Sequence, residues 1–407
     1  MRSVTRSTSV SPGSIDSPRA WLTVAATFCS SFVTLGIAYS FGSFFTSMAE
    51  EFGSTRGATA IIFGITTFLF FFLSLISGRA CDLWGPRPVL AVGSLALFTG
   101  LMATSRVNSL GVGYLTYGAG VGIAASCGYI PMVATVGGWF QAKRAAAIGL
   151  AVAGIGAGTL VMSPLSAALI NQYGWRTTYQ ILGVSGSLVL LICMLVTDRP
   201  PGQVGPQPAR FGDALGSSVF RRLHLSGLCS GLALFVPFVF VGQYAKEQGV
   251  ESVQAAVLVG VLGGASVVAR IGFGSLVRRF GSFTLYRLSF VLLAVSFLLW
   301  LVAGSSYIVL LGFVTVLGVG YGGFVALSTI VLAERLGIAG LGSILGLFYT
   351  SQGLGGLIGP PTAGWIIDRT GSYRIAIVGC FALISLGRIL LIGLPVTATG
   401  SLEPEQP

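Results

Sequence analysis

The chain has 407 residues, of which 54% are hydrophobic and only 9% are charged. A soluble domain carries about 25% charged residues, so a soluble protein of this composition could not cover its surface with polar groups. Lipid is the expected solvent for most of that surface, and at roughly 20 apolar residues per crossing there is room for about a dozen helices. The net charge of +11 does not indicate a nucleic-acid partner, because the basic residues form short clusters between apolar runs, as in loops at a cytoplasmic membrane face.

Side chains that carry catalytic or metal chemistry are few. The six cysteines are scattered, mostly within apolar runs, without the spacing of a metal site or a disulfide framework. The single histidine, His224, follows Arg221 and Arg222, which indicates a helix start at the cytoplasmic face. The sequence also has no nucleophile–base pair and no phosphate-binding loop. We therefore expect neither an enzyme nor an ATP-driven pump, and no metal or cofactor.

Twelve apolar segments, taken in chain order, predict an all-α membrane protein with twelve transmembrane helices. The first six are expected at 20–48, 58–81, 87–106, 109–138, 144–171 and 175–197. The second six are expected at 219–246, 252–279, 283–303, 306–333, 340–367 and 372–394. These sets define an N-terminal bundle at 19–197 and a C-terminal bundle at 219–394. The remaining polar segments are a disordered tail at 1–18, a Pro- and Gly-rich linker at 198–218 and a second tail at 395–407.

The loop charges predict the orientation of these helices. An even number of crossings places both termini on one side of the membrane. The loops of that side hold the larger basic clusters, whereas several basic residues of the other side stand beside acids. The excess of Lys and Arg marks the cytoplasmic side, so we expect both termini and the linker in the cytoplasm.

The two halves share glycine, proline and loop residues at an offset of about 195 positions. Corresponding residues are Gly154, Gly156, Gly158 and Pro164 in the first half and Ser351, Gly353, Gly355 and Pro361 in the second. The loops at 173–176 and 370–374 also correspond. A repeat of this length is too long for a solenoid. It indicates two pseudo-symmetric six-helix halves, which is the parallel-repeat arrangement of major facilitator transporters.

The loop after the second expected helix holds Gly78, Asp82, Gly85 and Arg87. It resembles the major facilitator loop between helices two and three, usually written G-x-x-x-D-R-x-G-R-R, although Leu83 replaces the basic residue after the acid. In that family the loop helps to hold the cytoplasmic gate, so the resemblance implies a gating role here. An acid at this place can pair with, or cap, helix ends that separate and rejoin. A plain solvated loop is the alternative.

Shorter motifs narrow the resemblance. The segments 139–145 and 129–131 and the pair Ala269-Arg270 resemble the bacterial monocarboxylate transporter and oxalate/formate antiporter group. Two positions depart from related carriers. Ser266 stands where animal monocarboxylate carriers have an acid, and Ser43 stands near the place of their helix-one lysine. The antiporters also have a second basic residue in helix eleven, which is missing here, so a substrate with one carboxylate is favoured over a dianion.

Arg270 lies inside an apolar segment, about nine residues from its expected cytoplasmic end. A charge deep in a membrane helix costs about 2.5–3.5 kcal/mol on insertion scales, so it normally faces a cavity and has a partner. No Asp or Glu falls well within any expected helix, and a substrate anion could therefore supply that partner. A guanidinium grips a carboxylate with two parallel hydrogen bonds. The alternative is that Arg270 extends to the cytoplasmic interface.

Uncharged polar side chains are the expected companions of Arg270 in a substrate-binding site. They are Tyr39, Ser43, Tyr129, Ser266, Tyr321, Tyr349 and Gln352. Tyr39 and Ser43 are four residues apart on one helix face, and so are Ser266 and Arg270. Each of them alone is also explained by packing or by an interfacial position.

These observations predict a secondary transporter of small monocarboxylate anions such as lactate or pyruvate, working by alternating access of two six-helix bundles. Proton coupling is what the family resemblance implies. The expected partners are a small organic anion, a proton and the lipid bilayer, with a monomer in the cell membrane. Two alternatives stay open: a major facilitator exporter of drugs or other hydrophobic compounds, which would not need Arg270, and a membrane receptor that binds a ligand without transporting it.

Overall fold

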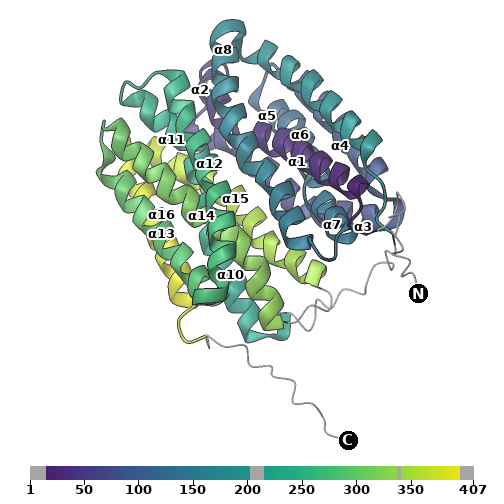
Figure 1. The fold of residues 1–407 in the computed structure, drawn as a ribbon. Helices are drawn as coiled ribbons and strands as arrows, with labels where there is room; N and C mark the ends of the chain where they lie inside the picture. The colour runs from purple at the N-terminus through teal and green to yellow at the C-terminus, as the bar shows by residue number, and fades with distance from the viewer. Residues whose placement is uncertain (1–14, 202–214, 337–340, 395–407) are drawn as a thin grey trace, which may run out of the picture.

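The computed structural model describes residues 15–201, 215–336 and 341–394. Most of the expected linker, nearly all of the first tail and the whole second tail lie outside the described residues. The described chain is helical almost throughout, and its helices stand side by side in two groups (Figure 1). In lipid, backbone N–H and C=O groups must be satisfied within the segment, which is why long apolar segments form helices there.

The first half runs from α1 to α8. Its elements are α1 (Pro18–Tyr39), α2 (Phe41–Glu51), α3 (Arg56–Trp84), α4 (Pro86–Thr104), α5 (Leu110–Gly113), the π-helix η1 (Tyr114–Ala119), α6 (Gly120–Gly128), α7 (Ile130–Trp139) and α8 (Arg144–Val196). The second half holds α10 (Ser218–Leu234), α11 (Val236–Glu247), α12 (Ser252–Phe280), α13 (Ser282–Ala303), α14 (Tyr307–Leu336), α15 (Leu341–Thr370) and α16 (Tyr373–Leu390).

The crossings agree with the twelve that the sequence predicts. Among the described residues, ten helical segments are long and apolar enough to cross a membrane. One of them, the 53-residue α8, contains two crossings, because Gly174 adopts φ 76° and ψ 161° and reverses the chain. The 30-residue α15 completes the set. Gly371 occupies the corresponding turn of the second half with φ 64°, and such positive φ values are open mainly to glycine.

Three predicted helices are interrupted. The first and seventh crossings break at Ser40 and Phe235, which are themselves about 195 positions apart. The fourth crossing contains the π-helix η1 and a break at Tyr129, where φ is −119° and ψ is −77°. Pro131 follows that break, and proline removes a backbone donor from a helix. The Ser30 hydroxyl of α1 donates to the Gly128 carbonyl at 2.6 Å, which satisfies an acceptor beside the break.

The two halves meet along two long seams with the same construction, one between α3 and α15 and one between α8 and α12. A Cβ atom added to Gly64 would stand 2.9 Å from the Leu357 carbonyl oxygen, and one added to Gly260 would stand 2.9 Å from the Leu160 oxygen. These two glycines occupy equivalent places in the repeat. Small residues therefore let the backbones of the two bundles touch directly, as is common between membrane helices.

One face of the molecule, here named the terminal face, carries the start of α1 and the end of α16 (Figure 1). Within the first bundle, Arg87 Nη2 binds Asp198 Oδ1 at 2.6 Å on this face, and Arg19 lies 3.7 Å from the same carboxylate. Asp16 accepts hydrogen bonds from the backbone of 141–143. The expected first tail therefore has ordered residues at its end, and α1 begins at Pro18.

Candidate functional site

Arg270 lies in α12, at the seam with α8 and about 15 Å from the end of its helix. Its Nη1 donates to the Val152 carbonyl oxygen at 3.0 Å, which links the two bundles. Its Nε and Nη2 are buried and have no hydrogen-bond partner among the described residues. The guanidinium carbon lies 5.6 Å from the ring centre of Tyr321, a cation–π contact. Arg270 thus points into the protein rather than to a membrane interface.

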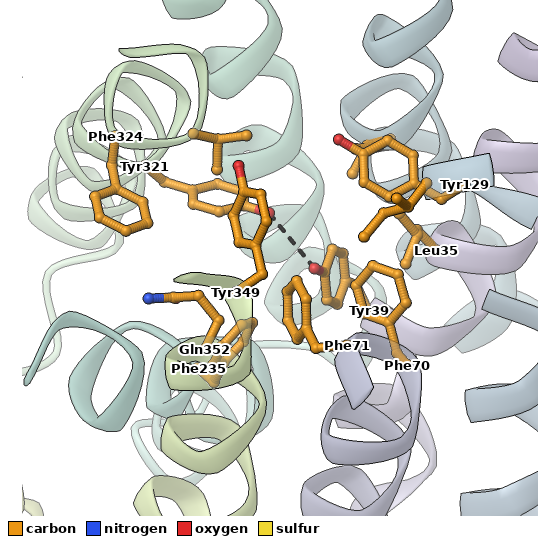
Figure 2. A pocket seen from close by; sticks show the side chains of 13 residues that line it. Leu35, Tyr39, Phe70, Phe71, Tyr129, Phe235, Tyr321, Phe324, Tyr349 and Gln352 are labelled. Atoms are coloured by element: carbon orange, nitrogen blue, oxygen red, sulfur yellow. Dashed lines mark hydrogen bonds between the residues drawn. The ribbon is translucent and has the colours of Figure 1, made fainter. Parts of the chain in front are cut away.

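A narrow cavity lies between the two bundles at this level, and Tyr321 forms part of its wall (Figure 2). Its volume is about 30 Å³, which is room for little more than a water molecule. The lining residues are Leu35, Tyr39, Phe70, Phe71, Tyr129, Ile130, Ile155, Phe235, Tyr321, Phe324, Val325, Tyr349 and Gln352. The wall comes from both bundles, so their separation would enlarge the cavity.

Five of the predicted site residues line this cavity: Tyr39, Tyr129, Tyr321, Tyr349 and Gln352. The hydroxyl oxygens of Tyr39 and Tyr321 are 3.4 Å apart and join the two bundles (Figure 2). The Tyr349 hydroxyl lies 3.1 Å from Ser328 Oγ. Gln352 Nε2 donates to the Gly227 carbonyl at 2.6 Å. The cavity therefore gathers residues that lie far apart in the sequence.

Ser43, Ser266 and Arg270 are not part of the cavity wall; Arg270 lies next to it, against the ring of Tyr321. The Ser43 hydroxyl donates to the Ser163 carbonyl at 3.2 Å, and the Ser266 hydroxyl donates to the Gly263 carbonyl at 2.7 Å. Ser266 is fully buried beneath Arg270 at the α8–α12 seam. Both hydroxyls are thus engaged with backbone groups in this conformation.

Acidic residues stay away from Arg270 in the described part of the chain. Asp82, Glu334 and Asp368 each lie two residues before the end of their helix. The other described acids lie at helix ends or in loops. No carboxylate of a described residue forms an ion pair with Arg270.

In the loop expected to take part in gating, the ion pair is made by Arg87 and not by Asp82. Asp82 is exposed and makes no ion pair with a described residue. Gly85 supplies a turn with φ 88° against which the Arg199 side chain packs. Arg87 binds Asp198 at 2.6 Å, an acid that the sequence assigns to the linker. An added Cβ at Gly78 would meet nothing within 4 Å, so tight packing does not explain this glycine.

Sequence reasoning missed four phenylalanines of the cavity wall: Phe70, Phe71, Phe235 and Phe324. Phe71 of α3 stacks on Tyr349 of α15 with ring centres 5.7 Å apart and an interplanar angle of 15°. This contact crosses the bundle interface. No sequence signal marks these residues, because apolar aromatic side chains occur throughout the membrane helices.

The face opposite the terminal face is closed by charges that join the bundles. Arg56 at the start of α3 binds Glu247 Oε1 at 2.8 Å and lies 3.6 Å from Asp368. The Asp368 carboxylate also accepts from the backbone N–H groups of Arg56 and Gly57, at 3.2 Å and 3.0 Å. An acid of one bundle therefore caps a helix of the other, where its charge is favourable.

We expect Arg56→Ala to open this closure more often, because it removes both ion pairs while the backbone cap remains. Partly exposed pairs are each worth about 0.2–1 kcal/mol, which for the two together corresponds to about a two- to thirtyfold change. The measurement is the labelling rate of Phe45→Cys, a buried position that contacts Phe240 of the other bundle, by a membrane-impermeant thiol reagent in a cysteine-free background. Arg176→Ala is the matched control, because its 2.6 Å pair with Glu51 stays within one bundle. Equal labelling rates in the two variants would contradict a role of Arg56 between the bundles.

Two six-helix bundles around a central cavity, with the incompletely paired Arg270 beside it, define a polytopic membrane transporter. The Major Facilitator Superfamily matches residues 27–360, and the chain belongs to that superfamily.

Its relatives within the superfamily include several monocarboxylate transporters. Monocarboxylate transporter 12 of Rattus norvegicus is 31% identical, with 94% of this chain and 87% of the relative aligned. Monocarboxylate transporter 4 of Rattus norvegicus is also 31% identical, over 89% and 81%. Monocarboxylate transporter 11 of Mus musculus is 29% identical, over 92% and 87%.

Solved structures share the fold at low sequence identity. A bacterial homologue of the human lysosomal transporter Spinster, in an inward-facing and occupied conformation, aligns with a TM-score of 0.73 and 15% identity, covering 92% of this chain and 96% of that one. The nucleoside transporter NupG aligns with a TM-score of 0.74 and 13% identity, covering 92% and 98%.

Proposed function

We propose that this protein transports small monocarboxylate anions by alternating access. The observation that carries the proposal is the state of Arg270, whose Nε and Nη2 are buried without a hydrogen-bond partner in the described part of the chain, beside a cavity between the bundles. The monocarboxylate transporters named above are similar over most of the chain, which supports the same substrate class.

The geometry of the guanidinium suits a carboxylate. Nη1 already donates to the Val152 carbonyl, so the Nε–Nη2 edge is the part of the guanidinium that is available to a ligand. The two N–H groups of that edge are parallel donors and match the two oxygens of a carboxylate. A buried charged donor without a partner is costly, and an anion bound there would remove that cost. One cation without a neighbouring acid favours one carboxylate over a dianion or a neutral substrate.

Movement of the two bundles would give access from each side in turn. The Arg56 closure seals the face opposite the termini, and the bond from Arg270 to Val152 joins the bundles nearer the terminal face. Because both sets of contacts cross the interface, each can break while the other holds. This is the rocking of two halves about a central site that such repeats permit.

Several finer points belong to the same proposal. The terminal face is cytoplasmic, and the protein works as a monomer in the cell membrane. The loop with Gly78, Asp82, Gly85 and Arg87 takes part in gating at that face. The described spans hold no acid near Arg270, so the proton crosses with the substrate carboxylate rather than on a membrane side chain.

Uptake of radiolabelled lactate and pyruvate into proteoliposomes, with and without an inward proton gradient, tests the proposal. Gradient-driven uptake by the wild type that is lost in Arg270→Ala is expected. Uptake that needs Arg270 but ignores the gradient would remove proton coupling and keep the substrate class.

Other outcomes would change the function itself. If uptake is equal in wild type and Arg270→Ala, the role of Arg270 is wrong. If a folded wild type takes up neither these acids nor other monocarboxylates but moves neutral hydrophobic compounds, the exporter alternative is correct. Saturable binding without any transport would indicate a receptor.

A further inference from the structure

We infer that the substrate is a monocarboxylate with an apolar, aromatic body, of the phenylacetate class, in preference to small hydroxy and keto acids. The inference rests on the proposed function, because it takes Arg270 as the partner of the carboxylate. It adds what the aromatic cavity next to Arg270, which Tyr321 connects to it, selects.

The wall of the cavity is mostly aromatic. Eight of its residues carry aromatic rings: Tyr39, Phe70, Phe71, Tyr129, Phe235, Tyr321, Phe324 and Tyr349. Four others are aliphatic, namely Leu35, Ile130, Ile155 and Val325. Rings attract a further ring in offset-stacked or edge-to-face contacts beyond what burial of apolar area provides. A substrate with an aromatic body would therefore gain more here than an aliphatic or polar one.

The polar atoms of the wall are nearly all engaged already. The Tyr39 and Tyr321 hydroxyls bind each other, and the Tyr349 hydroxyl binds Ser328. The Gln352 amide donates to the Gly227 carbonyl. The Tyr129 hydroxyl alone among the tyrosines of the wall has no hydrogen-bond partner in the described part of the chain. A substrate hydroxyl or keto group would lose its water partners on entry and find few replacements, which disfavours it.

The rings that must part for a substrate to enter come from both bundles. Phe71 of α3 stacks on Tyr349 of α15 across the interface, and Tyr39 of α1 lies 4.6 Å from the ring of Phe238 in α11. Opening the narrow cavity exposes the flat faces of Phe71 and Tyr349. An aromatic substrate restores stacking on those faces, whereas an aliphatic chain does not.

The experiment is isothermal titration of the full-length protein in lipid nanodiscs with phenylacetate, butyrate, lactate and phenylacetamide. Binding is measured rather than uptake, because lipophilic weak acids also cross bilayers unaided. Phenylacetate is expected to bind about tenfold more tightly than lactate. Phenylacetamide has the same ring without the charge and is expected not to bind. Arg270→Ala is expected to abolish binding of every acid.

The variant Phe71→Leu keeps an apolar side chain but removes the ring. It should weaken phenylacetate binding about fivefold more than it weakens butyrate binding, which reduces the preference for phenylacetate by that factor. Phe72→Leu is the matched control, since Phe72 is the next residue of α3 but is 47% exposed on the outer surface. The wild-type ratios test the inference even if Phe71→Leu does not fold.

Two results would overturn the inference in distinguishable ways. Lactate binding as tight as phenylacetate, with both lost in Arg270→Ala, would refute the aromatic preference and leave the proposed function standing. Equal binding of phenylacetate and phenylacetamide, or binding that survives Arg270→Ala, would refute carboxylate recognition and with it both proposals.

Discussion

Arg270→Lys is expected to weaken binding of the carboxylate substrate by about 10- to 100-fold while the protein stays folded. The positive charge remains, but a lysine cannot offer the parallel N–H pair of the Nε–Nη2 edge while also reaching the Val152 carbonyl. Each lost hydrogen bond to a charged group is worth about 1.5–3 kcal/mol, which converts to that range. The dissociation constant from titration in nanodiscs and the thermal unfolding midpoint are the two measurements.

Arg278→Lys is the control for this substitution, because Arg278 is exposed in the last turn of the same helix. It should change neither the dissociation constant nor the unfolding midpoint. Wild-type affinity in Arg270→Lys would mean that only the charge of Arg270 matters, and the two-bond geometry would then be wrong. A collapse of the unfolding midpoint would instead assign Arg270 a structural role at the α8–α12 seam.

Arg270 could be found from sequence because a cation in a long apolar segment is energetically anomalous wherever it points. The aromatic wall of the neighbouring cavity could not be predicted from the sequence. Phe71 and Phe72 are adjacent and identical, yet one lines the cavity and the other is exposed on the outer surface. Which of the two side chains faces the other bundle depends on how α3 is rotated about its axis relative to α15. The amino-acid composition of the helix does not indicate that rotation.

Two serines show the converse: the sequence pattern selected them, but they lie outside the cavity wall. Ser43 and Ser266 share helix faces with predicted site residues, but each hydroxyl binds a backbone carbonyl. The Ser266 hydroxyl bonds back to a carbonyl one turn away, as is common in helices, whereas the Ser43 hydroxyl bonds to Ser163 of α8. An i, i+4 spacing cannot separate a ligand contact from either kind of bond to the backbone. In the same way, the sequence identifies Asp368 as a helix end but cannot show that it caps α3 of the other bundle.

The spans themselves were predictable, since lipid forces every apolar segment of sufficient length to satisfy its own backbone. The breaks at Ser40 and Tyr129 were not. The break at Tyr129 depends on a hydroxyl from another helix, Ser30, and on Pro131, which many membrane helices tolerate. The repeat does account for the matching breaks at Ser40 and Phe235 and for the two similar seams, because two copies of one fold place equivalent residues at equivalent contacts.

Substitutions at two glycines of α8, only two residues apart, are expected to separate folding from transport. A Cβ at Gly158 would stand 2.2 Å from the Phe32 carbonyl oxygen, inside the first bundle. A Cβ at Gly156 would stand 2.4 Å from the Gly263 oxygen and 2.3 Å from Val267, across the seam between the bundles. Overpacking of this kind costs about 1–3 kcal/mol.

Gly158→Ala should therefore lower the unfolding midpoint, because α1 and α8 cannot move apart without disrupting their bundle. Gly156→Ala should leave the midpoint near that of the wild type and reduce uptake about tenfold or more, because the strain is relieved when α8 and α12 separate. Gly149→Ala, on the same helix with nothing within 4 Å of an added Cβ, should change neither property. If Gly156→Ala destabilises the fold as much as Gly158→Ala, the α8–α12 seam is part of one rigid core and the two halves do not rock about it. If instead it lowers uptake alone, the seam is a moving contact, and Arg270, which lies on that seam, would be positioned to link substrate binding to its opening.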